Sequence, residues 1–155
     1  MKEASKTIID KFLEFLFGKP TIVSDPFFGE MVDAGDYYEC ERLFTPIGDT
    51  VEIFLTKKEN GPDEKQINFF LRLEENYDLF IQRISPSMEE AIQEWIPKFR
   101  IQNFKQEFSF KSLSIPKCDE SVSKWELSFY ARNDLRHYCE LTMEGMEVKA
   151  IHIDG

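Results

Sequence analysis

The sequence predicts a mixed α+β domain built on antiparallel sheet. Three observations lead to this fold class: a helical apolar pattern at the N-terminus, two separate runs of short alternating segments, and a helical stretch between those runs. Strands that occur in runs, with helices between the runs, are typical of antiparallel rather than doubly wound parallel sheets. The expected order is α-βββ-αα-ββββ. The length of 155 residues suits a single domain covering residues 1–155.

The first third of the chain predicts one helix and three β segments. Residues 5–17 form an amphipathic helical pattern, which Gly18 and Pro20 end. The β segments follow between groups of turn-forming residues. They are 21–24 running into 27–32, then 37–44, then 51–56.

The middle of the chain predicts two helices. The motif GPDEKQ opens the first, because Pro62 fits a first helical turn and Asp63 suits the positive end of the helix dipole. Its apolar stripe continues to about residue 84. Ser85-Pro86 predicts the start of the second helix, with Ser85 as its cap, and Pro97 limits its end. The last third predicts four strands, at 106–115, 124–131, 137–143 and 146–153.

Turn positions allow the register of two hairpins to be predicted. In the first, a four-residue turn Asp33–Asp36 pairs Val32 with Tyr37 and Met31 with Tyr38. A five-residue loop Arg132–Arg136 pairs Phe129 with Cys139 and Leu127 with Leu141. In the last hairpin, a two-residue turn at Glu144-Gly145 pairs Leu141 with Val148, Cys139 with Ala150, and His137 with His152. The resulting apolar face would specify the register strongly.

Charge and composition restrict the classes of partner. The chain has 29 acidic and 19 basic residues, a formal net charge of −10. Such a surface repels nucleic acid and anionic membranes and favours a basic protein partner. The three cysteines have no CxxC spacing, which indicates free thiols in a reducing compartment. With no signal-peptide pattern and no apolar run of spanning length, we expect a cytoplasmic protein.

The evidence for an enzyme in the sequence is weak. It contains no GxSxG, Walker, GxGxxG or HExxH motif, so we expect a non-enzymatic protein without a cofactor. The predicted register places His137, Cys139 and His152 together at one end of the apolar face. This trio would suit zinc, or a histidine-activated thiol in a small hydrolase. The alternative is two partly buried histidines at a sheet edge, each with one hydrogen bond.

An acidic segment at residues 25–52 carries most of the charge excess. It contains eight acidic residues and one base, Arg42. The alternative is a solvent-exposed edge hairpin whose charges serve only to prevent aggregation with other strands. The segment also contains Phe27, Phe28, Tyr37, Tyr38 and Phe44, however, and aromatics within an acidic field suit a protein interface. DNA mimicry is a variant of this hypothesis. The candidate partner-binding residues are Phe28, Glu30, Asp33, Asp36, Tyr37, Glu39 and Glu41.

The two adjacent phenylalanines of this segment should differ in role. Because side chains alternate across a strand, we expect Phe27 in the core and Phe28 on the acidic surface. Gly29 would reset this alternation if it marks a bulge.

The motifs DPFFGEM, YYECERLF, GDTVEIFL and GPDEKQINFF resemble a group of uncharacterised bacterial domains over residues 22–84. That group has a D-x-x-FG strand, an aromatic-bearing second strand, a G-x-x-V-x-I/L strand and a helix opened near a glutamine. Some of its members are predicted immunity proteins of polymorphic toxin systems. The resemblance implies a small intracellular inhibitor that caps the active site of a basic toxin.

A further alternative is a subunit of a larger assembly that uses the helix at 8–17 as its contact.

Overall fold

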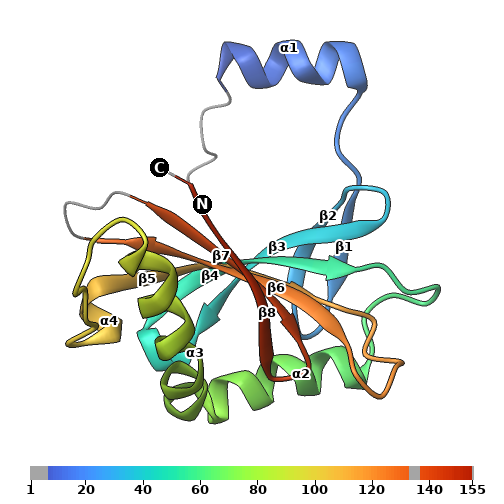
Figure 1. Ribbon diagram of the computed structural model, residues 1–155. Helices are drawn as coiled ribbons and strands as arrows, with labels where there is room; N and C mark the ends of the chain where they lie inside the picture. Colours follow the sequence, from blue (N-terminus) through green and yellow to red (C-terminus); the bar gives the residue numbers. More distant parts are fainter. Residues whose placement is uncertain (1–6, 133–136, 155) are drawn as a thin grey trace.

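The computed structural model describes residues 7–132 and 137–154 (Figure 1). It forms one eight-stranded sheet in which the strands lie side by side in sequence order. Every neighbouring pair is antiparallel except β4 and β5, which are parallel. The elements are α1 (Ile8–Phe17), β1 (Ile22–Asp25), β2 (Gly29–Asp33), β3 (Tyr37–Phe44), a 3₁₀ turn η1 (Thr45–Ile47), β4 (Asp49–Thr56), α2 (Glu64–Glu75), α3 (Tyr77–Gln93), α4 (Phe104–Glu107), β5 (Phe108–Ile115), β6 (Lys124–Ala131), β7 (Tyr138–Glu144) and β8 (Glu147–Asp154).

The predicted α+β class with a mostly antiparallel sheet is therefore confirmed. The sheet is larger than expected, because both groups of strands belong to it and the first group has four strands. The additional strand arises at residues 26–28, where the chain turns sharply. Asp25 Oδ1 accepts hydrogen bonds from the backbone N–H groups of Phe27 at 2.9 Å and Phe28 at 2.8 Å. Gly29 then takes a φ of +75°, which a glycine adopts without strain.

The predicted register of β2 and β3 is wrong by two residues. Val32 lies opposite Glu39, and Asp33 lies opposite Tyr38. The turn is tighter than expected, because the N–H of Ala34 bonds the carbonyl of Tyr37 at 2.9 Å. A shift of two residues keeps each side chain on its predicted face. Met31, Tyr38 and Cys40 are accordingly buried together.

The predicted boundary between the two central helices is also wrong. The break falls at Asn76, whose backbone and side-chain nitrogens both bond the carbonyl of Arg72, at 3.0 and 2.9 Å. Pro86 lies inside α3 instead of opening it. Just before it, the hydroxyl of Ser85 donates to the carbonyl of Ile81 at 2.6 Å. The proline therefore costs this helix one backbone hydrogen bond without ending it.

Helices α2 and α3 connect β4 to its parallel neighbour β5 and cover one face of the sheet (Figure 1). Their apolar stripes and the inner side chains of the strands form one core. Its largest fully buried side chains include Phe44, Phe70, Phe80 and Phe129.

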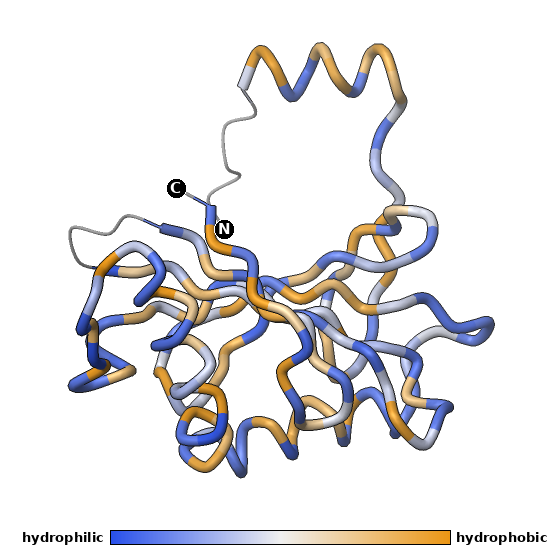
Figure 2. Tube along the Cα trace, viewed as in Figure 1, coloured by the Kyte–Doolittle hydropathy of each residue, from blue (hydrophilic) through white to orange (hydrophobic). Residues whose placement is uncertain are grey.

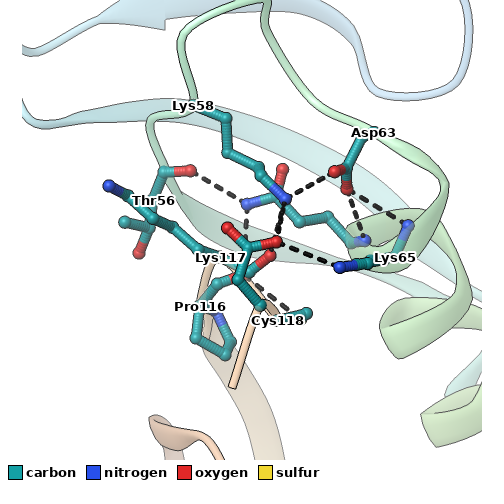
Figure 3. A network of polar contacts seen from close by, with 9 residues as sticks. Thr56, Lys58, Asp63, Lys65, Pro116, Lys117 and Cys118 are labelled. Atoms are coloured by element: carbon teal, nitrogen blue, oxygen red, sulfur yellow. Dashed lines mark hydrogen bonds and ion pairs between the residues drawn. The ribbon is translucent and has the colours of Figure 1, made fainter.

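Gln66 attaches the start of α2 to the ends of the parallel pair. Figure 3 shows the contacts of Lys58, Asp63 and Lys65 around this point. The side-chain nitrogen of Gln66 donates to the carbonyls of Thr56 at 2.9 Å and Pro116 at 3.1 Å, just where β4 and β5 end. Asp63 caps α2 by accepting from the backbone of Lys65 and Gln66. Lys58 bonds the carboxylates of Asp63 and Asp119, so the helix start is held to both strand ends.

The C-terminal strands follow the prediction closely in β6 and β7. Phe129 lies opposite Cys139, and Leu127 lies opposite Leu141, as expected. The loop predicted at 132–136 falls mostly on residues 133–136, outside the described residues.

The register predicted for the last hairpin is wrong. Its turn is Gly145-Met146, with Glu144 opposite Glu147, and Gly145 has a φ of +58°. Glycine at the first central position is typical of such two-residue turns. An irregularity then places Thr142 opposite Ala150 and skips Lys149. After this bulge, Ile151 and Ile153 face the core in place of the predicted Ala150.

Candidate functional site

The face of the sheet opposite α2 and α3 is its uncovered side, here called the open face. Pairing across the strands creates one row of side chains over most of its width. This row consists of Glu41, Glu52, Ser112, Ser128, Glu140 and His152. At its centre the hydroxyls of Ser112 and Ser128 lie 2.5 Å apart. Its carboxylates at Glu41, Glu52 and Glu140 are exposed, whereas Ser128 at its centre is buried.

Glutamates dominate the charge of the open face near its centre. Glu41 on β3 lies directly opposite Glu52 on β4, and both are exposed. Like charges in this position destabilise a strand pair. Glu39, Glu126 and Glu140 project to the same side, as the alternation and pairing of their strands require. The open face therefore carries an excess of carboxylates over the bases exposed on its central strands, Lys111 and Lys124.

Arg42, the one base of residues 25–52, points away from this field. It follows Glu41 on β3 and so lies on the helix-covered side. Its guanidinium stacks over the ring of Phe27, 3.7 Å from the ring centroid, and donates to the carbonyl of Phe27. The cation thus stabilises the turn at 26–28 instead of pairing with Glu41.

Two aromatic pairs lie on the open face among the acids. Tyr37 contacts Phe54 edge-to-face, with ring centroids 5.8 Å apart. Tyr130 and Tyr138 form a similar pair at 5.9 Å. The negative charge of Glu39, together with its hydrogen bond, raises the pKa of Tyr37. Exposed tyrosines beside carboxylates can bury aromatic area and donate hydrogen bonds to a partner.

The structure brings together four of the seven candidate partner-binding residues. Tyr37, Glu39 and Glu41 follow one another on the outer side of β3. Glu30 lies on the same face as Val32, which is opposite Glu39. These four residues form the β2–β3 end of the open face.

Asp33 and Asp36 belong instead to the turn between β2 and β3. Asp33 forms an ion pair with Lys57 at 2.6 Å and accepts from the N–H of Gly35 at 2.9 Å. The hydrogen bond from Lys57 holds the pKa of Asp33 below its usual range. The carbonyl of Asp36 accepts from the N–H of Lys57 at 3.0 Å. Both residues stabilise the turn and its attachment to the end of β4.

The prediction that Phe28 is exposed is wrong. Its side chain is only 3% exposed, whereas Phe27 is the partly buried member of the pair. The Asp25 turn and Gly29 reset the alternation, so the roles of the two phenylalanines are exchanged. The rings contact each other edge-to-face at 4.9 Å. Phe28 is therefore a core residue and not part of the open face.

The sequence prediction missed the half of the open face that lies beyond β3. Glu52, Phe54, Glu126 and Glu140 extend the acidic aromatic surface across four further strands. Their alternation with apolar neighbours already marked them as outward-facing. The β3–β4 pairing places Glu52 beside Glu41, whereas only the joining of both strand groups into one sheet brings Glu126 and Glu140 onto the same face.

The predicted trio of histidines and cysteine does not assemble. His152 lies opposite Glu140 on the open face, whereas Cys139 is buried on the other side. Burial raises the pKa of Cys139 to about 11, which keeps the thiol protonated. His137 packs against Trp95, with ring centroids 4.8 Å apart. Among the described residues, no group of three histidine, cysteine or acidic side chains is placed to hold a metal ion.

Helix α1 stands apart from the rest of the structure, on the side of the sheet opposite α2 (Figure 1). None of its residues is buried. Of the helices in residues 7–132 and 137–154, none has the length and apolar character needed to cross a membrane.

Comparisons with protein-family models, with curated proteins and with solved structures give no match for this chain.

Proposed function

We propose that the chain is a protein-binding module whose open face binds a basic protein. The observation that carries this proposal is the pair Glu41 and Glu52, which oppose each other on an uncovered sheet while Arg42 turns away. A cation supplied by a partner would convert their repulsion into attraction. Sites that break a local stability rule without compensation within the fold are where function is expected.

The specific form that we propose is an immunity-like inhibitor of a basic toxin. A nuclease that binds phosphates presents a cationic active site, and the open face offers carboxylates with tyrosines between them. Such complementary charge accelerates encounter and selects the partner. The resemblance over residues 22–84 to predicted immunity proteins supports the same form. Inhibition would be steric, since the bound sheet face covers the catalytic surface.

A charge-reversal experiment tests this function. Glu41→Lys/Glu52→Lys should abolish recovery of the basic partner from native cells, and binding by the wild-type chain should weaken as salt rises. The matched control is Glu75→Lys/Glu90→Lys, which changes net charge equally on exposed helix positions. The control should bind like the wild type. Equal recovery by both double variants would overturn the open face as the interface.

The immunity role requires a second assay. A toxin gene beside the gene for this chain should arrest cell growth when expressed alone. Coexpression of the wild-type chain should restore growth, and coexpression of Glu41→Lys/Glu52→Lys should not. A binding partner that is recovered but has no toxicity would support the module and exclude the immunity role.

A further inference from the structure

Helix α1 carries an apolar surface that remains exposed in the part of the chain that the structure describes. Its large hydrophobic side chains are between 45% and 87% exposed. They are Ile8, Ile9, Phe12, Leu13, Phe15, Leu16 and Phe17. The helix is nonetheless well delimited, with a capping box formed by Thr7 and Asp10 and an end at Gly18. Figure 2 shows its alternating apolar and polar colours. An exposed apolar surface of this kind marks an interaction site.

A cleft of about 690 Å³ lies between α2 and the segments 118–123 and 145–146. Phe69 and Met146 supply most of its accessible apolar surface, above a floor formed by the buried side chains of Leu73, Phe80 and Trp125. Trp125 is fixed in place because its indole N–H donates to the carbonyl of Gly145 at 2.7 Å. The Trp125 ring also contacts the rings of Phe69 at 5.1 Å and Phe80 at 5.7 Å. We call this preformed hollow the α2 cleft.

The two rims of the α2 cleft carry opposite charge. Lys65 and Arg72 line it from α2, and Glu120 lines it from the facing loop. Lys65 also lies 3.3 Å from Asp119, so Arg72 is the main cation of its rim. A helix that enters the cleft with its apolar side would need an acid on one flank and a base on the other.

The flanks of α1 meet this requirement. At about 100° per residue, Asp10 lies beside Phe17 at one edge of the apolar surface. Lys11 lies beside Phe15 at the other edge. With the apolar side in the cleft, Lys11 faces Glu120, while Asp10, whose carboxylate caps the helix through Thr7, lies on the side of Lys65 and Arg72. Amphipathic helices bind apolar grooves in this way, with charged flanks fixing the orientation.

The α1 helix of the same chain is poorly placed to fill this cleft. The linker between α1 and β1 comprises residues 18–21, which reach about 14 Å at most. The cleft lies at β6 and the β7–β8 turn, and five strand spacings separate β1 from β6, about 24 Å. In addition, α1 lies on the opposite side of the sheet from α2 (Figure 1). The helix that fits the cleft therefore comes from another molecule.

We propose that two copies of this chain associate by placing α1 of each copy in the α2 cleft of the other. Reciprocal exchange of this kind closes into a symmetric dimer and leaves no unused cleft. The open face takes no part in it, so this inference stands independently of the proposed function.

Sedimentation of the full chain tests the proposal. The wild type should form a concentration-dependent dimer. Phe12→Glu in the helix and Arg72→Glu at the cleft should each weaken it at least about tenfold, as truncation of an interface anchor does. Leu79→Glu is the matched control, because Leu79 is 65% exposed on α3 and does not line the cleft. It should leave the dimer unchanged. A strictly monomeric wild type at high concentration would overturn the proposal.

Mixing two variants separates this arrangement from pairing of two α1 helices. Phe12→Glu retains an intact cleft, and Arg72→Glu retains an intact helix, so a 1:1 mixture can form a heterodimer with one intact contact. It should do so at a concentration at which each variant alone is monomeric. Lys11→Glu should weaken the dimer, and Glu120→Lys should restore it in the double variant. A dimer that depends on Phe12 but not on Arg72 or Glu120 would show that α1 binds elsewhere and would overturn the cleft as its site.

Discussion

Glu41 and Glu52 lie directly opposite each other on neighbouring strands of the open face. We predict that Glu52→Gln stabilises the isolated chain, because it removes this repulsion. The free energy of unfolding should rise by roughly 0.5 kcal/mol at low salt, the scale of a cross-strand pair, and the gain should shrink as salt screens the charges. Urea unfolding at two ionic strengths measures both effects. Glu90→Gln, an exposed change on α3, should give no comparable gain.

Phe28→Ala should lower the free energy of unfolding by about 3 kcal/mol, since it removes a buried aromatic ring from the core. Leu43→Ala, at a side chain that is 55% exposed on β3, should change it by less than about 0.5 kcal/mol. Urea unfolding of both variants checks the prediction. A Phe28→Ala variant that is as stable as the wild type would contradict the placement of Phe28 in the core.

Gln66→Leu should be strongly destabilising although the two side chains are similar in size. The change removes the donor that bonds the carbonyls of Thr56 and Pro116. Leaving these partly buried carbonyls without a partner costs about 1–3 kcal/mol, which is offset in part because the change also removes Gln66 Oε1, a buried acceptor with no hydrogen bond in the described residues. Asn68→Leu, at an exposed position of the same helix, is the control. Hydrogen exchange should show faster opening at the ends of β4 and β5 in Gln66→Leu only.

The contribution of Lys58 to stability should depend on pH at both extremes. Its hydrogen bonds lower the pKa of Asp63 and Asp119, and the same contacts raise the pKa of Lys58. The stability that Asp63 and Asp119 contribute is complete above the ordinary aspartate pKa of about 3.9. It is lost as pH falls through their lowered pKa values. The lysine contribution is complete below about 10.4 and is lost as pH rises through the raised value.

The stability difference between the wild type and Lys58→Met should therefore be largest near neutral pH and should narrow below about pH 4. Urea titrations at pH 7, at pH 5 and in acid would measure it. A constant difference across this range would mean that Lys58 acts through packing alone.

The three thiols should differ in reactivity. Burial raises the pKa of both Cys40 and Cys139 to about 11, and neither should react quickly with a maleimide at neutral pH. Cys118 is partly exposed and should react first, although burial also raises its pKa. Labelling of native Cys118→Ser should lack the fast phase. A fast phase that persists in this variant would indicate an accessible Cys40 or Cys139.

Local pattern was sufficient to predict most of the secondary structure. Alternation located β6 and β7 and paired Phe129 with Cys139, because one face of that hairpin is apolar throughout. The alternation pattern gave the wrong structure where a hydrogen bond between one side chain and the backbone changed the direction of the chain. Asp25 turns the chain at 26–28, and Asn76 ends α2 at a position where the apolar stripe continues unbroken.

The open face could not be assembled from the sequence, because it depends on which strands become neighbours. Glu52 and Ser112 are brought side by side only by the parallel pairing of β4 and β5. No turn sequence encodes that pairing. It results from the helices that connect the two strands and from the hydrogen bonds of Gln66 to the ends of both strands.

The parallel pairing of β4 and β5 also affects the order in which parts of the chain can fold. Within the four strands before it and within the four after it, consecutive strands are separated by at most eight residues, so each half can form by closing small loops. The pairing of β4 with β5 must bring together strands separated by residues 57–107, which contain α2, α3 and α4. Contacts of high sequence separation form slowly. We therefore expect two fast-forming halves whose docking at Gln66 sets the refolding rate.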